Sequence, residues 1–294
     1  MEAYLVAIGI IALIYMLLSL GLTLQYGLTG LINFGHVGFY AIGAYTSALL
    51  AMKGVPLVFS FAAAAALAAL AAWPIGLISL RLRDDYFAIV TLGFSEVVRI
   101  VVTSEQWLTS GVQGIPGIPQ LYGGIGGFGG QAAVFATLFA VTLIGIWMIR
   151  RIARSPFGRI IEAIRDNEEA VQALGKDPAR FKIQVLVVGA ALAGIAGAFY
   201  AHYITYIVPD QFIPLVTFYV WMAIIMGGVG RVSGAVVGTA ILMLFLEGSR
   251  FLRDVVPGIS EVNMASVRIG VVGLLLIGFI MFRPQGLMGD YTKR

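Results

Sequence analysis

Long apolar runs dominate the chain, and six of them contain no charged residue. These uncharged stretches cover residues 3-52, 54-80, 106-149, 183-209, 211-230 and 232-246. A helix needs about 20 mostly apolar residues to cross the hydrocarbon core of a bilayer, which is roughly 30 Å thick. The pattern therefore predicts an all-α polytopic integral membrane protein and excludes an ordinary water-soluble enzyme.

Dividing the apolar runs at their turn residues gives about nine transmembrane helices. We place them near 3-25, 35-52, 56-80, 86-104, 131-150, 183-207, 214-230, 234-252 and 265-283. The composition agrees, since 60% of the 294 residues are hydrophobic and 12% are charged, against about 45–50% and about 25% in soluble domains. Cysteine is absent, which excludes disulfides, a thiolate nucleophile and a Cys-based metal site.

The distribution of basic residues predicts the orientation. Lys and Arg gather in the interior segment 150-182, and short basic loops stay on the cytoplasmic side. Because successive loops alternate sides, the loop at 81-85 and the C-terminal tail also lie inside, and 105-130 and 208-213 lie outside. The N-terminus is then outside and the C-terminus is cytoplasmic.

A broken, Gly-rich helix is predicted near 26-38. Backbone that leaves helical geometry at membrane depth must be covered by protein or face a water-filled cavity, and transporters place substrate sites beside such discontinuous helices. One interpretation is the lining of a translocation pathway; the other is a tight turn whose glycines permit close helix packing. The candidate pathway residues are Gln25, Gly30, Asn33, Gly35, His36 and, further along, Thr46.

Two charged residues fall inside the fourth predicted span. Glu96 and Arg99 are three residues apart and share one helical face. A helix that starts near Tyr86 puts Glu96 about 15 Å along it, close to the bilayer middle, where a charge costs about 2.5–3.5 kcal/mol on insertion scales. We expect an ion pair that faces the bundle; a proton relay or a substrate contact is the alternative.

Residues 155-175 predict two short amphipathic helices. Ser155 followed by Pro156 is typical of a helix start, and Asn167 can cap a second helix that runs to Leu174 and ends at Gly175. The first helix carries an apolar stripe of Phe157, Ile160, Ile161 and Ile164 beside Arg159 and Arg165. Such helices can pack on the protein's own cytoplasmic face, lie on lipid headgroups, or insert into a groove of a soluble partner.

Several short segments, in order along nearly the whole chain, point to one family. They are residues 27-36, 43-46, 80-94, 191-203, 226-230 and 282-287, together with Ser155, Pro156, Phe157, Gly158 and Arg159. These segments resemble the branched-chain amino acid ABC importer permeases of the LivM type.

The resemblance implies one ABC importer transmembrane domain over residues 1-294, with a cytoplasmic coupling segment at 151-182 that contacts an ATPase. It implies four kinds of partner: a LivH-type permease subunit, two cytoplasmic ATP-binding subunits, a periplasmic substrate-binding protein and the lipid bilayer of the bacterial inner membrane. Nucleic acid is not expected.

ATP and Mg would be used by the partner ATPases, because this chain has no Gly-x4-Gly-Lys-Ser/Thr phosphate-binding loop. We expect no cofactor, metal site or catalytic residue in this chain. The resemblance implies inward transport of leucine, isoleucine and valine by alternating access. Urea, short amides or other amino acids are alternative cargoes, and a secondary transporter or channel that works alone is the alternative class.

Overall fold

The computed structural model describes residues 2–79, 84–248, 270–271, 273–274, 277–278, 281–282 and 285–288. The α-helices in this part of the chain are α1 (Glu2–Leu22), α2 (His36–Met52), α3 (Leu57–Ser79), α4 (Asp84–Ser104), α5 (Gln106–Thr109), α6 (Phe128–Ala153), α7 (Pro156–Asp166), α8 (Glu168–Ala173), α9 (Pro178–Ile204), α10 (Pro214–Gly227) and α11 (Val232–Gly248). The shorter elements are the π-helical turn η1 (Thr23–Leu28), the 3-10 turns η2 (Gly111–Gln113) and η3 (Pro209–Gln211), and the strands β1 (Ile115–Pro116) and β2 (Tyr206–Ile207).

The all-α membrane architecture is confirmed, but the count of about nine spans is not. Six segments of the described chain are long and apolar enough to cross a bilayer: Glu2–Leu28, Leu57–Ile78, Tyr86–Ser104, Phe128–Ala153, Pro178–Ile204 and Pro209–Gly227. Helices α2 and α11 have 17 residues each. The last predicted span, 265-283, lies mostly outside the described residues.

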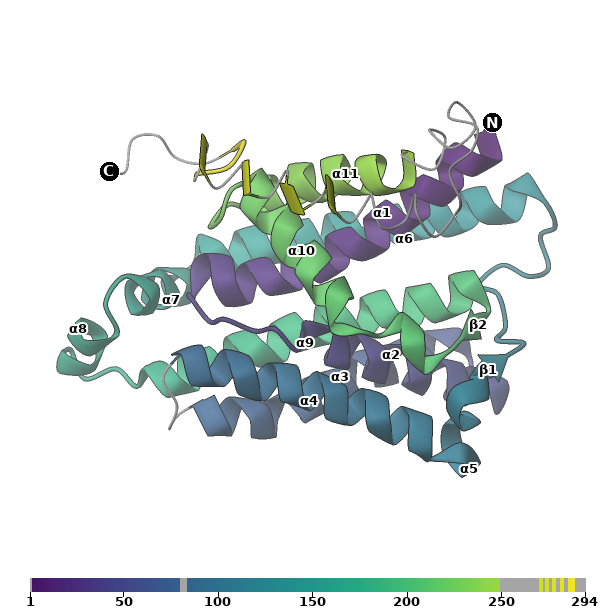
Figure 1. Ribbon diagram of the computed structural model, residues 1–294, viewed down its shortest axis with the longest axis horizontal. Coiled ribbons are helices and arrows are strands. Elements are labelled where there is room, and N and C mark those ends of the chain that lie inside the picture. The colour runs from purple at the N-terminus through teal and green to yellow at the C-terminus, as the bar shows by residue number, and fades with distance from the viewer. Residues whose placement is uncertain are drawn as a thin grey trace.

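Helix α9 forms the centre of the bundle (Figure 1). It begins where Asp177 Oδ1 accepts a hydrogen bond from the Ala179 amide and Pro178 occupies the first turn. Its most extensive contacts are with α3, α2 and α1. Small residues let these helices approach closely, because a Cβ on Gly43 of α2 would overlap the Gly194 carbonyl of α9.

The bundle has two distinct ends. At one end β1 pairs antiparallel with β2, and Ile115 lies opposite Ile207. This pairing joins the segment 105-130 to the chain just before the segment 208-213. The basic pattern assigns both segments to the same side of the membrane. The N-terminus lies at that end, and α7 and α8 extend from the other (Figure 1). Residues 285–288 lie at the α7 end, where the Leu287 amide donates to the Met226 carbonyl. The start of α1 and residues 285–288 thus lie at opposite ends of the bundle.

We expect the substitution Gly43→Val to destabilise the bundle by about 1–3 kcal/mol or more, because the added carbons must displace the backbone of α9. Ala66→Val, on the exposed side of α3, is the matched control and is expected to leave stability nearly unchanged. Thermal unfolding of the detergent-solubilised protein measures both. Equal melting temperatures for the two variants would contradict the close α2–α9 contact.

Candidate functional site

The predicted break between the first two spans exists, and it turns back into the bundle. Helix α1 continues through η1, residues 29–35 are not helical, and α2 starts at His36. His36 Nε2 lies 3.2 Å from the carbonyl of Leu18, ten residues before the end of η1. At 1.5 Å per residue, the chain has therefore returned about 15 Å into the bundle before α2 begins.

A buried amide network holds this re-entrant segment. Gln25 Nε2 donates to the Leu186 carbonyl of α9 (3.3 Å), and Asn33 Nδ2 donates to Gln25 Oε1 (2.9 Å). Asn33 Oδ1 in turn accepts from the amide of Gly35 (2.9 Å). Gln25 and Asn33 are completely buried, so the network supplies hydrogen-bond partners where water is excluded.

Three residues of other helices complete the hydrogen bonding of the segment. Thr91 of α4 accepts from the Phe34 amide (3.1 Å), and Thr217 of α10 accepts from the Val37 amide (3.0 Å). Trp221 of α10 donates its indole N–H to the Asn33 carbonyl (3.0 Å). Sequence reasoning did not identify Thr91, Thr217 and Trp221 as partners of the segment. The signal that could have found them is a polar or indole side chain inside an otherwise apolar helix.

The candidate pathway residues are thus brought together, but inside the packing of this chain. Gln25, Asn33, Gly35 and His36 are buried, which favours the packing interpretation for these side chains in this conformation. Gly30 makes the turn after η1 with φ +78°, a conformation that favours glycine. Thr46 is half-buried, further along α2.

The two short helices after α6 form as the capping residues predict. Ser155 Oγ accepts from the Gly158 amide (3.2 Å) at the start of α7, and Asn167 Oδ1 accepts from the Ala170 amide (2.9 Å) at the start of α8. Gly175, with φ +74°, ends α8, and the Lys176 amide donates to the Val171 carbonyl.

The apolar stripe of α7 packs on the chain's own body. Ile161 and Ile164 are buried, and the Phe157 ring lies 5.6 Å from that of Phe181 in α9. These residues anchor the helix, and the other side of the segment is left free for a partner. The exposed residues there include Arg159 and Leu174, of which Leu174 is 80% exposed.

Arg165 joins α7 to the broken helix. Its Nη1 donates to the Gly27 carbonyl of η1 (2.8 Å). A Cβ on Gly30 would meet Arg165 Cγ at 3.1 Å, and a Cβ on Gly230 would meet Arg165 Nη1 at 3.2 Å. Arg165, a candidate coupling residue, and the Gly-rich break thus touch one another.

Glu96 and Arg99 form the predicted ion pair. Arg99 Nε and Nη2 lie 3.0 and 2.8 Å from Glu96 Oε2. The expectation that the pair faces the bundle interior is wrong, since the two side chains remain 33% and 29% exposed. The reason is that α4 packs on its neighbours through Phe87, Thr91 and Ser95, which turns Glu96 and Arg99 outward.

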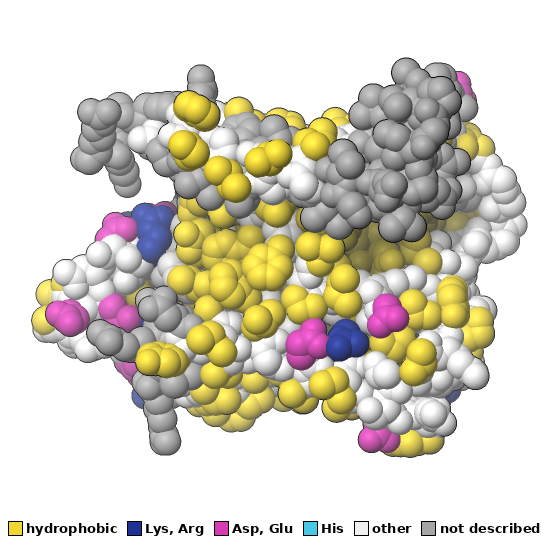
Figure 2. Space-filling view, in the orientation of Figure 1, with side chains coloured by type: hydrophobic (Ala, Val, Ile, Leu, Met, Phe, Trp, Pro, Cys, Tyr) yellow, Lys and Arg dark blue, Asp and Glu magenta, His cyan; other side chains and the backbone are white. Residues whose placement is uncertain are grey.

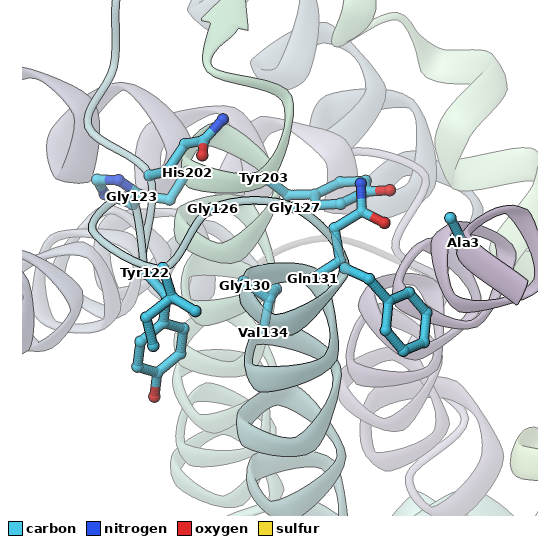
Figure 3. A pocket seen from close by; sticks show the side chains of 13 residues that line it. Ala3, Tyr122, Gly123, Gly126, Gly127, Gly130, Gln131, Val134, His202 and Tyr203 are labelled. Carbon is cyan, nitrogen blue, oxygen red and sulfur yellow. The ribbon is translucent and has the colours of Figure 1, made fainter.

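A pocket of about 480 Å³ opens at the end of the bundle opposite α7 (Figure 3). The Gly-rich turn before α6 and the end of α9 line it, with Gln131 and Tyr203 among the side chains shown. His202 fixes one wall, because its Nδ1 donates to the Pro119 carbonyl (2.7 Å) and its Nε2 lies 2.8 Å from Ser47 Oγ.

Comparison with known proteins gives a consistent result along the whole chain. The family model described as "Branched-chain amino acid transport system / permease component" matches residues 4–281. The high-affinity branched-chain amino acid transport system permease protein LivM of Escherichia coli is 34% identical, over 96% of this chain and 69% of the relative.

More distant relatives include permeases of the LivM and of the LivH type. The probable branched-chain amino acid transport permease protein LivM of Methanocaldococcus jannaschii is 27% identical, and the LivH permease of Escherichia coli is 26% identical, each over 94% of this chain and 91% of the relative. No solved structure gives a significant match.

We expect Asn33→Leu to lower the stability by about 1–3 kcal/mol, because Gln25 Oε1 and the Gly35 amide lose their partner in a buried site. Thr46→Val, which removes a hydroxyl from a half-buried position of α2, is the control and should change little. The melting temperature of the purified protein measures the difference. A normal melting temperature for Asn33→Leu would mean that the network does not hold the break.

Proposed function

The chain belongs to the family of permease components of branched-chain amino acid transport systems, and from that membership we propose that it is the membrane subunit of an ATP-driven importer. The resemblance found in the motifs is thereby confirmed. The names of the relatives, LivM and LivH, support a transporter built from two related permease subunits. In our proposal a LivH-type chain is the second subunit.

The placement of α7 carries the proposal. The segment 151-182 has an exposed side at one end of the bundle. Arg165, which belongs to α7 within this segment, contacts the broken helix through the Gly27 carbonyl. We assign the exposed side, with Arg159 and Leu174, as the contact for the ATPase. In our proposal α7 is a rigid extension of the bundle, because Gly158, Ile161 and Ile164 are buried and Phe157 and Ile160 are half-buried.

The mechanism we propose is alternating access driven by this contact. Nucleotide-dependent movement of two ATP-binding subunits displaces α7, and Arg165 transmits the displacement to η1 and Gly30. The re-entrant segment with Gln25, Asn33 and His36 then changes between two packed arrangements, because packed helices switch between discrete states. ATP and Mg are used by the partners, and this chain holds no metal or cofactor in the proposal.

We place the complex in the bacterial inner membrane, with the N-terminus outside and the C-terminus cytoplasmic. A periplasmic binding protein would deliver the solute at the end of the bundle that carries the pocket of Figure 3. The proposed cargo is leucine, isoleucine and valine, after the names of the relatives. Urea, short amides or other amino acids are the alternative cargoes in the same mechanism.

We expect Leu174→Asp to weaken copurification of the ATP-binding subunits and to reduce uptake about tenfold or more, because it puts a charge into the proposed contact. Trp107→Asp is the matched control: Trp107 is also 80% exposed, but it lies in α5 at the opposite end. Copurification and uptake into proteoliposomes measure the effect. Normal uptake by Leu174→Asp would count against docking at this surface.

Arg165→Leu is expected to separate ATP hydrolysis from transport. The ATPases should still copurify, since the exposed side of α7 is unchanged, but uptake should fall about tenfold because the link to Gly27 is lost. Asp166→Asn is the control, as it removes only the exposed carboxylate partner of Arg165. Uptake and ATP hydrolysis are measured on the same proteoliposomes. Uptake that proceeds without any ATPase subunit would instead support a transporter that works alone.

A further inference from the structure

Helices α3, α4 and α6 are only partly covered by the rest of this chain, and the exposed surface of α4 differs chemically from the other two. Less than a third of the apolar window of α3, α4 and α6 is buried, 22%, 22% and 28%. The exposed positions of α3 from 58 to 78 and of α6 from 136 to 147 are all apolar, and neither range contains a charged residue. These two surfaces suit lipid chains.

The outer surface of α4 is chemically different. Figure 2 shows a small group of acidic and basic side chains within the hydrophobic surface over α4, the helix of Glu96 and Arg99. Glu96 lies eight residues before the end of α4 at Ser104, which is about 12 Å, and about 18 Å from its start at Asp84. Glu96 is therefore near the middle of the membrane, and Arg99, about 8 Å before Ser104, lies nearer the end beside Asp210. A single charge at the middle costs about 2.5–3.5 kcal/mol against lipid, and although the ion pair lowers this cost, it favours a contact of this side of α4 with water or protein over lipid.

Asp210 of η3 adds a second carboxylate to the pair. Arg99 Nη1 lies 3.9 Å from Asp210 Oδ1, which is beyond hydrogen-bond distance, while Arg99 Nε and Nη2 are held by Glu96. The contact between Arg99 Nη1 and Asp210 is thus a long ion pair, and the Asp210 side chain is 84% exposed. With two carboxylates to one guanidinium, the group carries one net negative charge.

From these contacts we propose that the face of α4 around Glu96 and Ile100, with Arg99 and Asp210, lines the substrate route and binds the zwitterion of an α-amino acid. The carboxylate of the ligand accepts from Arg99 Nη1 and its ammonium donates to Asp210, so that the ligand lies alongside the long Arg99–Asp210 ion pair with each of its charges next to the opposite one. The excess negative charge favours a ligand with a free ammonium group over an anion without one. This inference rests on the proposed function, because it gives the importer its contact with the cargo.

Thiol labelling tests the proposal, because the chain has no cysteine of its own. Single cysteines are introduced as Ile100→Cys on α4, which is on the same face as Glu96, and as Leu70→Cys on α3 and Ile144→Cys on α6. These positions are 54%, 62% and 62% exposed in the isolated chain. Each variant is assembled with its partner subunits in vesicles, and labelling by water-soluble methanethiosulfonates is read on this chain alone. Thiols react as thiolates, which form in water and not in lipid.

We expect Ile100→Cys to react at least tenfold faster than the other two variants, and about tenfold faster with a cationic than with an anionic reagent. Adding Asp210→Asn should bring the ratio of the two rates close to one, because the net charge is removed. Leucine should slow the labelling of Ile100→Cys, whereas 4-methylpentanoate, which has the same carbon chain and carboxylate but no ammonium group, should not.

Labelling of Ile100→Cys as slow as that of Leu70→Cys and Ile144→Cys would overturn the proposal, since this face of α4 would then meet lipid or a dry subunit contact. Equal protection by leucine and 4-methylpentanoate would overturn the assignment of Asp210 to the ammonium group. Both readouts are made without ATP. A failure of the ATP-driven mechanism, seen as uptake without ATPase subunits, is therefore distinguishable from a failure of this site.

Discussion

The structure depends on keeping the main chain hydrogen-bonded where it leaves helical geometry inside the membrane. After Leu22 the chain passes through a π-helical turn and a re-entrant segment before α2 begins. No water is available in a bilayer core to pair free amides and carbonyls. Asn33 supplies one of the missing partners from within the segment, and Thr91, Thr217 and Trp221 supply others from α4 and α10. Gln25 ties the segment to α9 through the Leu186 carbonyl. The break is thus the place where α4, α9 and α10 meet.

This convergence explains how an element outside the membrane can act on the bundle. Arg165 of α7 donates to the Gly27 carbonyl within the same break, and the turn at Gly30 packs against the arginine stem. A displacement of α7 therefore bears on the part of the bundle that is held by side chains rather than by continuous helix. A segment held in this way can exchange one set of partners for another, which a continuous α-helix cannot do without losing its internal hydrogen bonds.

Local features of the fold could be predicted from the sequence, and relations between helices could not. The caps at Ser155 and Asn167, the break near Gly30 and the Glu96–Arg99 pair depend on residues close together in the chain, and all are present. The direction in which a helix turns its faces depends on its neighbours. For that reason the burial of Ile161 and Ile164 against the chain's own body was only one of three alternatives that the sequence left open. The exposure of Glu96 and Arg99 and the contacts of Thr217 and Trp221 were not foreseen.

The central claim is that movement of α7 reaches the broken helix through Arg165. The most direct test is the displacement of residues 23–35 relative to α9 between cryo-electron microscopy structures of the complete importer without nucleotide and with ATP bound. The account predicts that the Leu174 side of α7–α8 contacts an ATP-binding subunit in both states. It also predicts that residues 23–35 shift together with α7 while Arg165 stays on Gly27. An assembly in which α7 touches no ATP-binding subunit, or in which α7 moves and residues 23–35 stay fixed against α9, would contradict it.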